Sequence, residues 1–211
     1  QGSGTTLELR RKLAGAAFVR TATYDRAIQE YFDGLESDSK FPQSLNVAMR
    51  RKAILRYGEN PHQQAALYSS PGTTGANLVD ARQLNGKELS YNNLLDLDSA
   101  LSMVRDLPRA GAVVIKHNNP CGAASADTLA DACQKAMDGD PVSAFGSVLG
   151  FNREVDAATA TFLAKPGLFV EAIAAPAFAD EAIEILTTKP KWKSHVRLMQ
   201  VGELGQTPLS R

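Results

Sequence analysis

AVVIKHNNPCG, residues 112–122, joins an apolar run directly to a polar one. Residues 112–115 are small or β-branched, which is typical of a short buried strand. Pro120 cannot donate to a sheet ladder, and the asparagines and the glycine around it favour a turn. We therefore expect a strand followed by a polar turn, with Lys116 and His117 at the carboxyl end of the strand, where α/β proteins bind ligands. The alternative is an ordinary turn in which the imidazole only caps the strand.

Beyond this stretch, segments with the patterns of strands and helices alternate along the chain. Further strands are expected at 143–151, 169–174 and 196–201, and helices at 128–137, 155–163 and 179–186. This order predicts a layered α/β fold in which some of the strands pair in parallel.

The part of the chain before residue 112 is less regular. Apolar residues near a 3.6-residue spacing predict a helix over 7–33, which Gly34 would end, and residues 34–46 have the composition of a loop or linker. Residues 45–55 fit either a strand or a short helix. A second helix is expected over 92–107, where Pro108 stops it.

Composition limits the classes of function. Among the 211 residues, Lys plus Arg and Asp plus Glu both number 23, so the net charge is zero. This balance does not favour binding to nucleic acid or to a membrane surface. The longest apolar runs are interrupted, for example by Glu171 and Pro176, and are too short to span a membrane. The two cysteines, Cys121 and Cys133, form no disulfide framework, which favours a reduced, cytoplasmic setting.

Three other polar features are candidates for binding. Arg56 and Tyr57 place a forked cation beside an aromatic ring, which suits a phosphate or carboxylate but also an exposed turn. Gly146 could admit a ligand close to the backbone, or it could serve tight sheet packing. Glu171 lies within an apolar strand, so its carboxylate is a ligand group, half of an ion pair, or exposed at an edge.

Several other chemistries lack their sequence signals. The three histidines, His62, His117 and His195, have no zinc-site spacing. The segment 120–122 matches part of the zinc deaminase signature, but the second cysteine and the His-x-Glu are missing. The chain has no Gly-x-Ser-x-Gly elbow, P-loop or Gly-x-Gly-x-x-Gly motif. No metal is therefore expected.

Four segments, in this order, carry a resemblance to a known family. They are LRYGENPHQ (55–63), LNGKELSYNN (84–93), KHNNPCG (116–122) and DPVSAFG (140–146). Together they resemble the bifunctional purine biosynthesis family that joins aminoimidazole carboxamide ribonucleotide (AICAR) formyltransferase to inosine monophosphate (IMP) cyclohydrolase. The resemblance implies a layered α/β/α, cytidine-deaminase-like fold preceded by a helical segment. Residues 1–46 would be the last helices of the cyclohydrolase domain plus a linker, and 47–211 the first half of the formyltransferase domain.

The chemistry that the resemblance implies is formyl transfer from formyltetrahydrofolate to the amine of AICAR, in a protein that also closes the product to IMP. That amine is a poor nucleophile because it is conjugated, so a base must remove its proton while an oxyanion is stabilised. The resemblance makes His117 the general base and Lys116 the residue that stabilises charge and assists the folate leaving nitrogen.

The resemblance also implies the binding residues and partners. The expected substrate-binding residues are Arg56, Tyr57, Asn118, Gly146 and Glu171. Formyltetrahydrofolate would be a cosubstrate, no metal would be needed, and the protein would be a cytoplasmic homodimer. The alternative is an inactive fragment that binds the nucleotide or a partner chain without catalysis.

Overall fold

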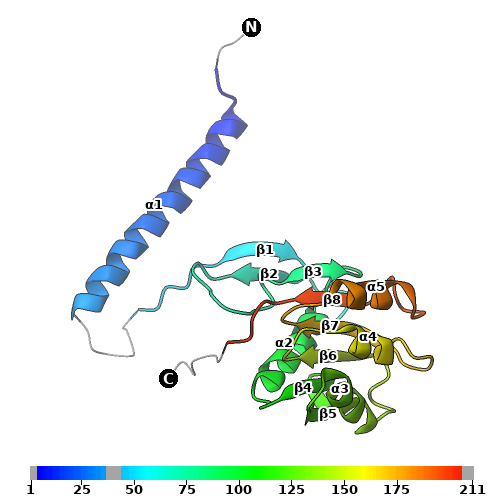
Figure 1. Cartoon of the computed structure of the whole chain (residues 1–211). Helices are drawn as coiled ribbons and strands as arrows, with labels where there is room; N and C mark the ends of the chain where they lie inside the picture. Colours follow the sequence, from blue (N-terminus) through cyan, green and yellow to red (C-terminus); the bar gives the residue numbers. More distant parts are fainter. Residues whose placement is uncertain (1–3, 37–43, 206–211) are drawn as a thin grey trace. The chain divides into compact units, whose positions relative to one another are not determined.

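The structure is a computed structural model in which residues 4–36 and 44–205 are described (Figure 1). The chain divides into two compact units, 1–50 and 51–211. Most of the linker expected over 34–46 lies outside the described residues, and the predicted domain boundary after residue 46 stays a prediction.

The first unit contains one long helix, α1 (Leu7–Glu36). Thr6 caps its start, since the Oγ1 of Thr6 accepts a hydrogen bond from the Leu9 amide at 3.1 Å. The prediction that Gly34 ends this helix is wrong, because the helix continues to Glu36. A glycine costs a helix only about 1 kcal/mol relative to alanine, which a helix of this length tolerates. None of the helices in the described ranges is both long and apolar enough to cross a membrane.

The second unit contains two sheets (Figure 1). The small one pairs β1 (Arg50–Ile54) with β2 (Ala66–Ser69), so the second half of the ambiguous segment 45–55 forms a strand. The spatial order of the six-stranded sheet is β3 (Arg82–Asn85), β8 (Arg197–Gln200), β7 (Val170–Ala175), β6 (Ser147–Phe151), β4 (Ala110–Lys116) and β5 (Asn119–Ala126). Strands β6, β7 and β8 are parallel, whereas β4 is antiparallel to both β5 and β6, and β3 to β8.

Helices cover both faces of the large sheet. They are α2 (Tyr91–Arg105), α3 (Leu129–Asp138), α4 (Ala157–Leu163) and α5 (Asp180–Thr188), each within a few residues of its expected place. Strand β4 illustrates the layering, because Val114 packs in the cluster with α3, α4 and α5 while Val113 packs with α2 on the other face. Both valines are fully buried, and burial of such a side chain stabilises a fold by about 1.5–3 kcal/mol. The α/β prediction is confirmed, while the cytidine-deaminase-like label stays a prediction.

The polar turn expected after Lys116 is much shorter than the sequence suggested. Only His117 and Asn118 form the turn, with φ of 52° and 63°, and β5 begins at Asn119. The expected turn through Gly122 is therefore wrong. Pro120 is tolerated in β5 because this strand is the last of the sheet, where a missing N–H donor leaves no neighbour unpaired.

The direction of β4 in the sheet decides which strand ends surround Lys116. Because β4 is antiparallel to β6, with Ile115 opposite Val148, the carboxyl end of β4 lies beside the amino ends of the parallel strands. Lys116 and His117 therefore lie at the carboxyl end of a strand, as expected, but this edge of the sheet otherwise carries the amino ends of the parallel strands. The strand expected over 143–151 begins only at Ser147, because Asp140 first forms a turn by accepting from the Ser143 amide at 3.1 Å.

Candidate functional site

A pocket of about 440 Å³ opens where β4 ends and where β6 and β7 begin. Its lining comes from the β1–β2 loop, from the residue before α2 and α2 itself, from the end of β4 and the β4–β5 turn, and from the starts of β6 and β7. The lining residues are Tyr57, Glu59, Ser90, Asn92, Asn93, Leu95, Asp96, Lys116, His117, Asn118, Gly146 and Glu171. Six of the seven predicted site residues are in this set, and the seventh, Arg56, contacts Tyr57.

Lys116 is fixed in the pocket wall by the loop that precedes β6. Its Nζ donates to the carbonyl oxygens of Phe145 at 2.9 Å and Gly146 at 3.1 Å. Gly146 has φ of 73°, and a Cβ there would lie 3.2 Å from the Phe169 ring and 3.3 Å from Lys116 Nζ. The glycine therefore lets the loop approach the lysine closely. An ammonium has three N–H donors, so one is left for a ligand beside these two contacts.

His117 and Asn118 form the two-residue turn at the tip of the β4–β5 hairpin, and both side chains are exposed. The Asn118 amide donates to Asp96 Oδ1 on α2 at 2.7 Å. The exposed imidazole can reach a substrate, and the turn rather than a strand sets its direction.

Arg56 and Tyr57 act as a pair beside the pocket. The Arg56 guanidinium lies over the Tyr57 ring, 4.7 Å from the centroid, and its Nη2 donates to the Tyr57 hydroxyl oxygen at 3.0 Å. Hydrogen bonds lower the pKa of Tyr57, with the larger effect from Arg56 and the next from Ser90. A stacked, planar cation at the mouth of a pocket suits an anionic group such as a phosphate.

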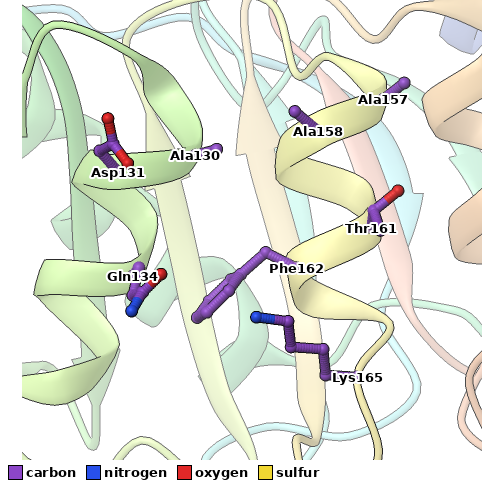
Figure 2. A pocket seen from close by; sticks show the side chains of 8 residues that line it. All are labelled: Ala130, Asp131, Gln134, Ala157, Ala158, Thr161, Phe162 and Lys165. Atoms are coloured by element: carbon purple, nitrogen blue, oxygen red, sulfur yellow. The ribbon is translucent and has the colours of Figure 1, made fainter.

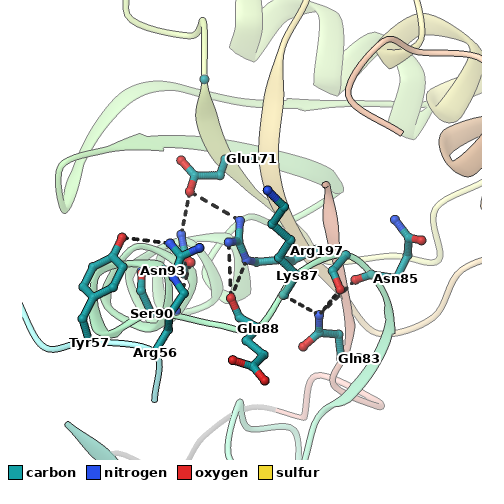
Figure 3. A network of polar contacts seen from close by, with 12 residues as sticks. Arg56, Tyr57, Gln83, Asn85, Lys87, Glu88, Ser90, Asn93, Glu171 and Arg197 are labelled. Atoms are coloured by element: carbon teal, nitrogen blue, oxygen red, sulfur yellow. Dashed lines mark hydrogen bonds and ion pairs between the residues drawn. The ribbon is translucent and has the colours of Figure 1, made fainter. Parts of the chain in front are cut away.

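A polar network continues from α2 to β8 (Figure 3). Asn93 Nδ2 donates to Glu171 Oε1 at 2.9 Å, and Arg197 Nη1 lies 3.4 Å from the same oxygen. The Arg197 Nε and Nη2 atoms both donate to the Glu88 carbonyl oxygen at 3.3 Å. Of the roles left open for Glu171, the structure supports two, since its carboxylate lines the pocket and is also half of an ion pair.

Arg197 is the buried member of this network, with 4% of its surface exposed. Burial lowers the pKa of its guanidinium, and the Glu171 carboxylate opposes that shift. Its contacts with the Glu88 carbonyl oxygen and the Glu171 carboxylate offset part of the cost of burying the charge. The start of β8 is thereby tied to the start of β7 at the pocket.

Several polar residues of this site were not predicted from the sequence. Ser90 and Asn93 form a capping box at the start of α2, in which Asn93 Oδ1 accepts from the Ser90 amide at 3.1 Å. The motif 84–93 contained both, and Ser-x-x-Asn before an apolar helix was the available signal. For Arg197, the available signal was a charged residue within the strand predicted over 196–201. Asp96 carried no sequence signal.

A second hollow of about 420 Å³ lies between α3 and α4 (Figure 2). Alanines form much of its lining, and Lys165 Nζ lies 4.8 Å from the centroid of the Phe162 ring. The charged groups among the described lining residues are Asp131 and Lys165. This hollow therefore has fewer groups for chemistry than the pocket beside Lys116. Among residues 4–36 and 44–205, no cluster of His, Cys, Asp or Glu is suited to hold a metal ion.

Comparison with known proteins defines the class. The family model described as AICARFT/IMPCHase bienzyme matches residues 1–210, so the chain belongs to this family. It is 62% identical over 203 residues to the bifunctional purine biosynthesis protein PurH of Rhodopirellula baltica, and the aligned region covers 96% of the chain and 39% of that protein. It is 47% identical over 190 residues to PurH of Halalkalibacterium halodurans, covering 90% of the chain and 36% of the relative. With PurH of Persephonella marina the identity is 44% over 199 residues, and the aligned region covers 93% of the chain and 38% of that relative.

These relatives are named as bifunctional proteins of purine biosynthesis, and the family prediction is confirmed. The chain spans well under half the length of each of them.

Proposed function

We propose that this chain forms part of a folate-dependent AICAR formyltransferase, within a protein of the relatives' length that also closes the product to IMP. The observation that carries the proposal is the meeting of Lys116, His117 and Glu171 in one pocket of a chain from the AICARFT/IMPCHase family. Lys116 and His117 are adjacent at the end of β4, whereas Glu171 comes from β7, so the fold brings two distant parts of the chain to one pocket.

In the proposed reaction, the amine of AICAR attacks the formyl carbon of formyltetrahydrofolate. His117 accepts the proton that the amine loses as the new C–N bond forms. Lys116 donates to the oxygen that gains negative charge and assists the folate nitrogen as it leaves. A positioned acid or base typically contributes about 10²–10⁴-fold to such a rate. The two carbonyl contacts of Lys116 support this role because they hold its ammonium at the pocket wall.

The nucleotide would lie across the same pocket. Arg56 and Tyr57 would bind its phosphate, since the stacked guanidinium has further N–H donors beside the one that it gives to Tyr57. Asn118, Glu171 and the backbone at Gly146 would contact the ribose and the base. The fixed amide of Asn93, held by Ser90 and Glu171, is suited to join them.

The remaining assignments are also proposals. Formyltetrahydrofolate would be a cosubstrate, no metal would take part, and nucleic acid and membranes would not be partners. The protein would act as a cytoplasmic homodimer. Residues 1–46 would belong to the cyclohydrolase domain and 47–211 to the first half of the formyltransferase domain.

The proposal is tested by assaying formyl transfer and cyclohydrolase activity in two proteins, the 211-residue chain and a full-length protein that contains it. We expect both activities in the full-length protein and neither in the chain alone, because positioning by the other segments supplies much of the rate. A full-length protein that binds AICAR without either activity would instead support the alternative of a binding piece. A chain that alone turns over AICAR at an ordinary rate would refute the assignment of its boundaries.

A further inference from the structure

The β4–β5 turn has an unusual conformation for its sequence. His117 and Asn118 both have positive φ, 52° and 63°, and the flanking Lys116 and Asn119 are paired in the ladder. Two-residue hairpin turns of this kind prefer Asn-Gly or Gly-Gly, because only glycine adopts positive φ without a steric cost. Asparagine and histidine tolerate the left-handed region better than most residues, yet two in succession need support from their surroundings.

Helix α2 provides that support at two points. The Asn118 amide donates to Asp96 Oδ1 at 2.7 Å, and Ser99 Oγ donates to the side-chain oxygen of Asn118. The two α2 residues are three positions apart and thus lie on one face of the helix. One bond therefore holds the turn by its backbone and the other by a side chain.

The supporting helix is itself rigidly placed. Leu97, Ala100 and Leu101 of α2 are buried against the sheet, with at most 2% of their surfaces exposed. Asp96 thus projects from a fixed element and lines the same pocket as Lys116 and His117. The turn itself is exposed and makes only one further hydrogen bond of its own, from Asn119 Nδ2 to the His117 carbonyl oxygen at 3.0 Å, among the described residues.

We propose that Asp96 and Ser99 are positioning residues, which hold the turn in its left-handed conformation and so keep the His117 imidazole directed for proton transfer. The proposal rests on the proposed function for its catalytic consequence, but its structural part stands on the contacts alone. Asp96 acts through the Asn118 amide, and it requires an oxygen acceptor at that point rather than a negative charge.

The first test measures the turn directly in the 211-residue chain by NMR. In Asp96→Ala we expect the backbone order parameters of His117 and Asn118 to fall from about 0.85 to below about 0.6, with faster exchange of the Asn118 amide proton. Asp96→Asn should keep both values, because its side-chain oxygen still accepts the bond. The matched control is Asp98→Ala, an exposed carboxylate two residues along the same helix, which should change neither.

Ser99→Ala provides a second variant, since alanine is a strong helix former and leaves α2 intact. It should lower the order parameter of Asn118, and it decides the question if Asp96→Ala does not fold. Unchanged order parameters in the folded variants, or an equal change in Asp98→Ala, would overturn the proposal.

The second test follows catalysis in the full-length protein. Asp96→Ala should lower the kcat of formyl transfer by about tenfold to a hundredfold, the scale of a misplaced reacting group, with a smaller rise in the KM for AICAR because Asn118 of the same turn is a proposed nucleotide contact. Asp96→Asn should restore most of the rate. If the unmodified protein shows no formyl transfer, the proposed function fails while the order parameters still decide the positioning role. A disordered turn with an unchanged kcat would overturn the catalytic part.

Discussion

Replacing Gly146 by alanine perturbs the contact between the loop before β6 and Lys116. The backbone there has φ of 73°, which costs a residue with a Cβ about 1–2 kcal/mol. The new Cβ would lie 3.2 Å from the Phe169 ring, which is itself packed edge-on against Phe145 with centroids 5.4 Å apart. Because this ring cannot yield freely, overpacking adds about 1–2 kcal/mol. We expect Gly146→Ala to lower the free energy of unfolding by about 2–4 kcal/mol.

The matched control is Gly72→Ala. Gly72 has a similar φ of 80°, but a Cβ there would meet nothing within 4 Å. This variant should therefore lose only the conformational part, about 1–2 kcal/mol. Since both variants replace glycine by alanine, the change in unfolded-state entropy cancels between them. The difference between the two variants then isolates the contacts with Phe169 and Lys116.

Urea unfolding followed by fluorescence measures both variants. Trp192 is the only tryptophan of the chain, is 7% exposed, and donates from its indole to the Leu168 carbonyl oxygen at 2.8 Å, so it reports the unfolding of the second unit. In a thermal scan, Gly146→Ala should lower Tm by roughly 4–16 °C, at about 2–4 °C per kcal/mol. Equal losses in Gly146→Ala and Gly72→Ala would refute the close approach of loop, ring and lysine.

Two further predictions concern the nucleotide and the core. Arg56→Lys should weaken AICAR binding to the full-length protein by roughly tenfold in calorimetric titration. The lysine lacks the planar fork and loses a charged hydrogen bond worth about 1.5 kcal/mol. Equal affinities of the two proteins would make Arg56 an ordinary turn residue. Burial raises the pKa of the Cys133 thiol in the folded protein. Above the pKa that this thiol has in the unfolded chain, only the unfolded state ionises, so the stability that the neutral thiol contributes is complete below that pH and is lost as pH rises above it. Unfolding free energies under reducing conditions should therefore fall between about pH 8.5 and 10 more steeply in the parent chain than in Cys133→Ala, and identical slopes would contradict this.

The parts of the fold that were predictable had strong local patterns. The helix expected over 92–107 and the strand over 112–115 were found because apolar residues repeat at the helical spacing or form a β-branched run. Strand β5 was missed because its sequence, NPCGAASA, consists of small residues, a proline and a glycine, all weak strand formers. Its place is set by the turn at His117 and by packing, since a Cβ on Gly122 would lie 1.9 Å from the Ala136 carbonyl oxygen of α3.

The candidate site was predictable only in part, because its contacts join distant residues. Motif resemblance pointed to Lys116, His117 and Glu171, but it gave no reason for Glu171 to meet the other two. Asn93 and Glu171 are 78 positions apart, and their hydrogen bond depends on how α2 packs against β7. The carboxylate of Asp96 reaches the turn across 22 positions, a contact that sequence periodicity cannot indicate.

The most direct test of the central claim is a paired rate measurement on His117→Ala in the full-length protein. Formyl transfer and ring closure to IMP are assayed separately on the same preparation, so the closure rate serves as the control for folding. We predict that formyl transfer falls by at least about two orders of magnitude, the scale for losing a positioned base, while closure is unchanged. A variant that keeps most of its transfer rate would contradict the assignment of this pocket as the site of formyl transfer.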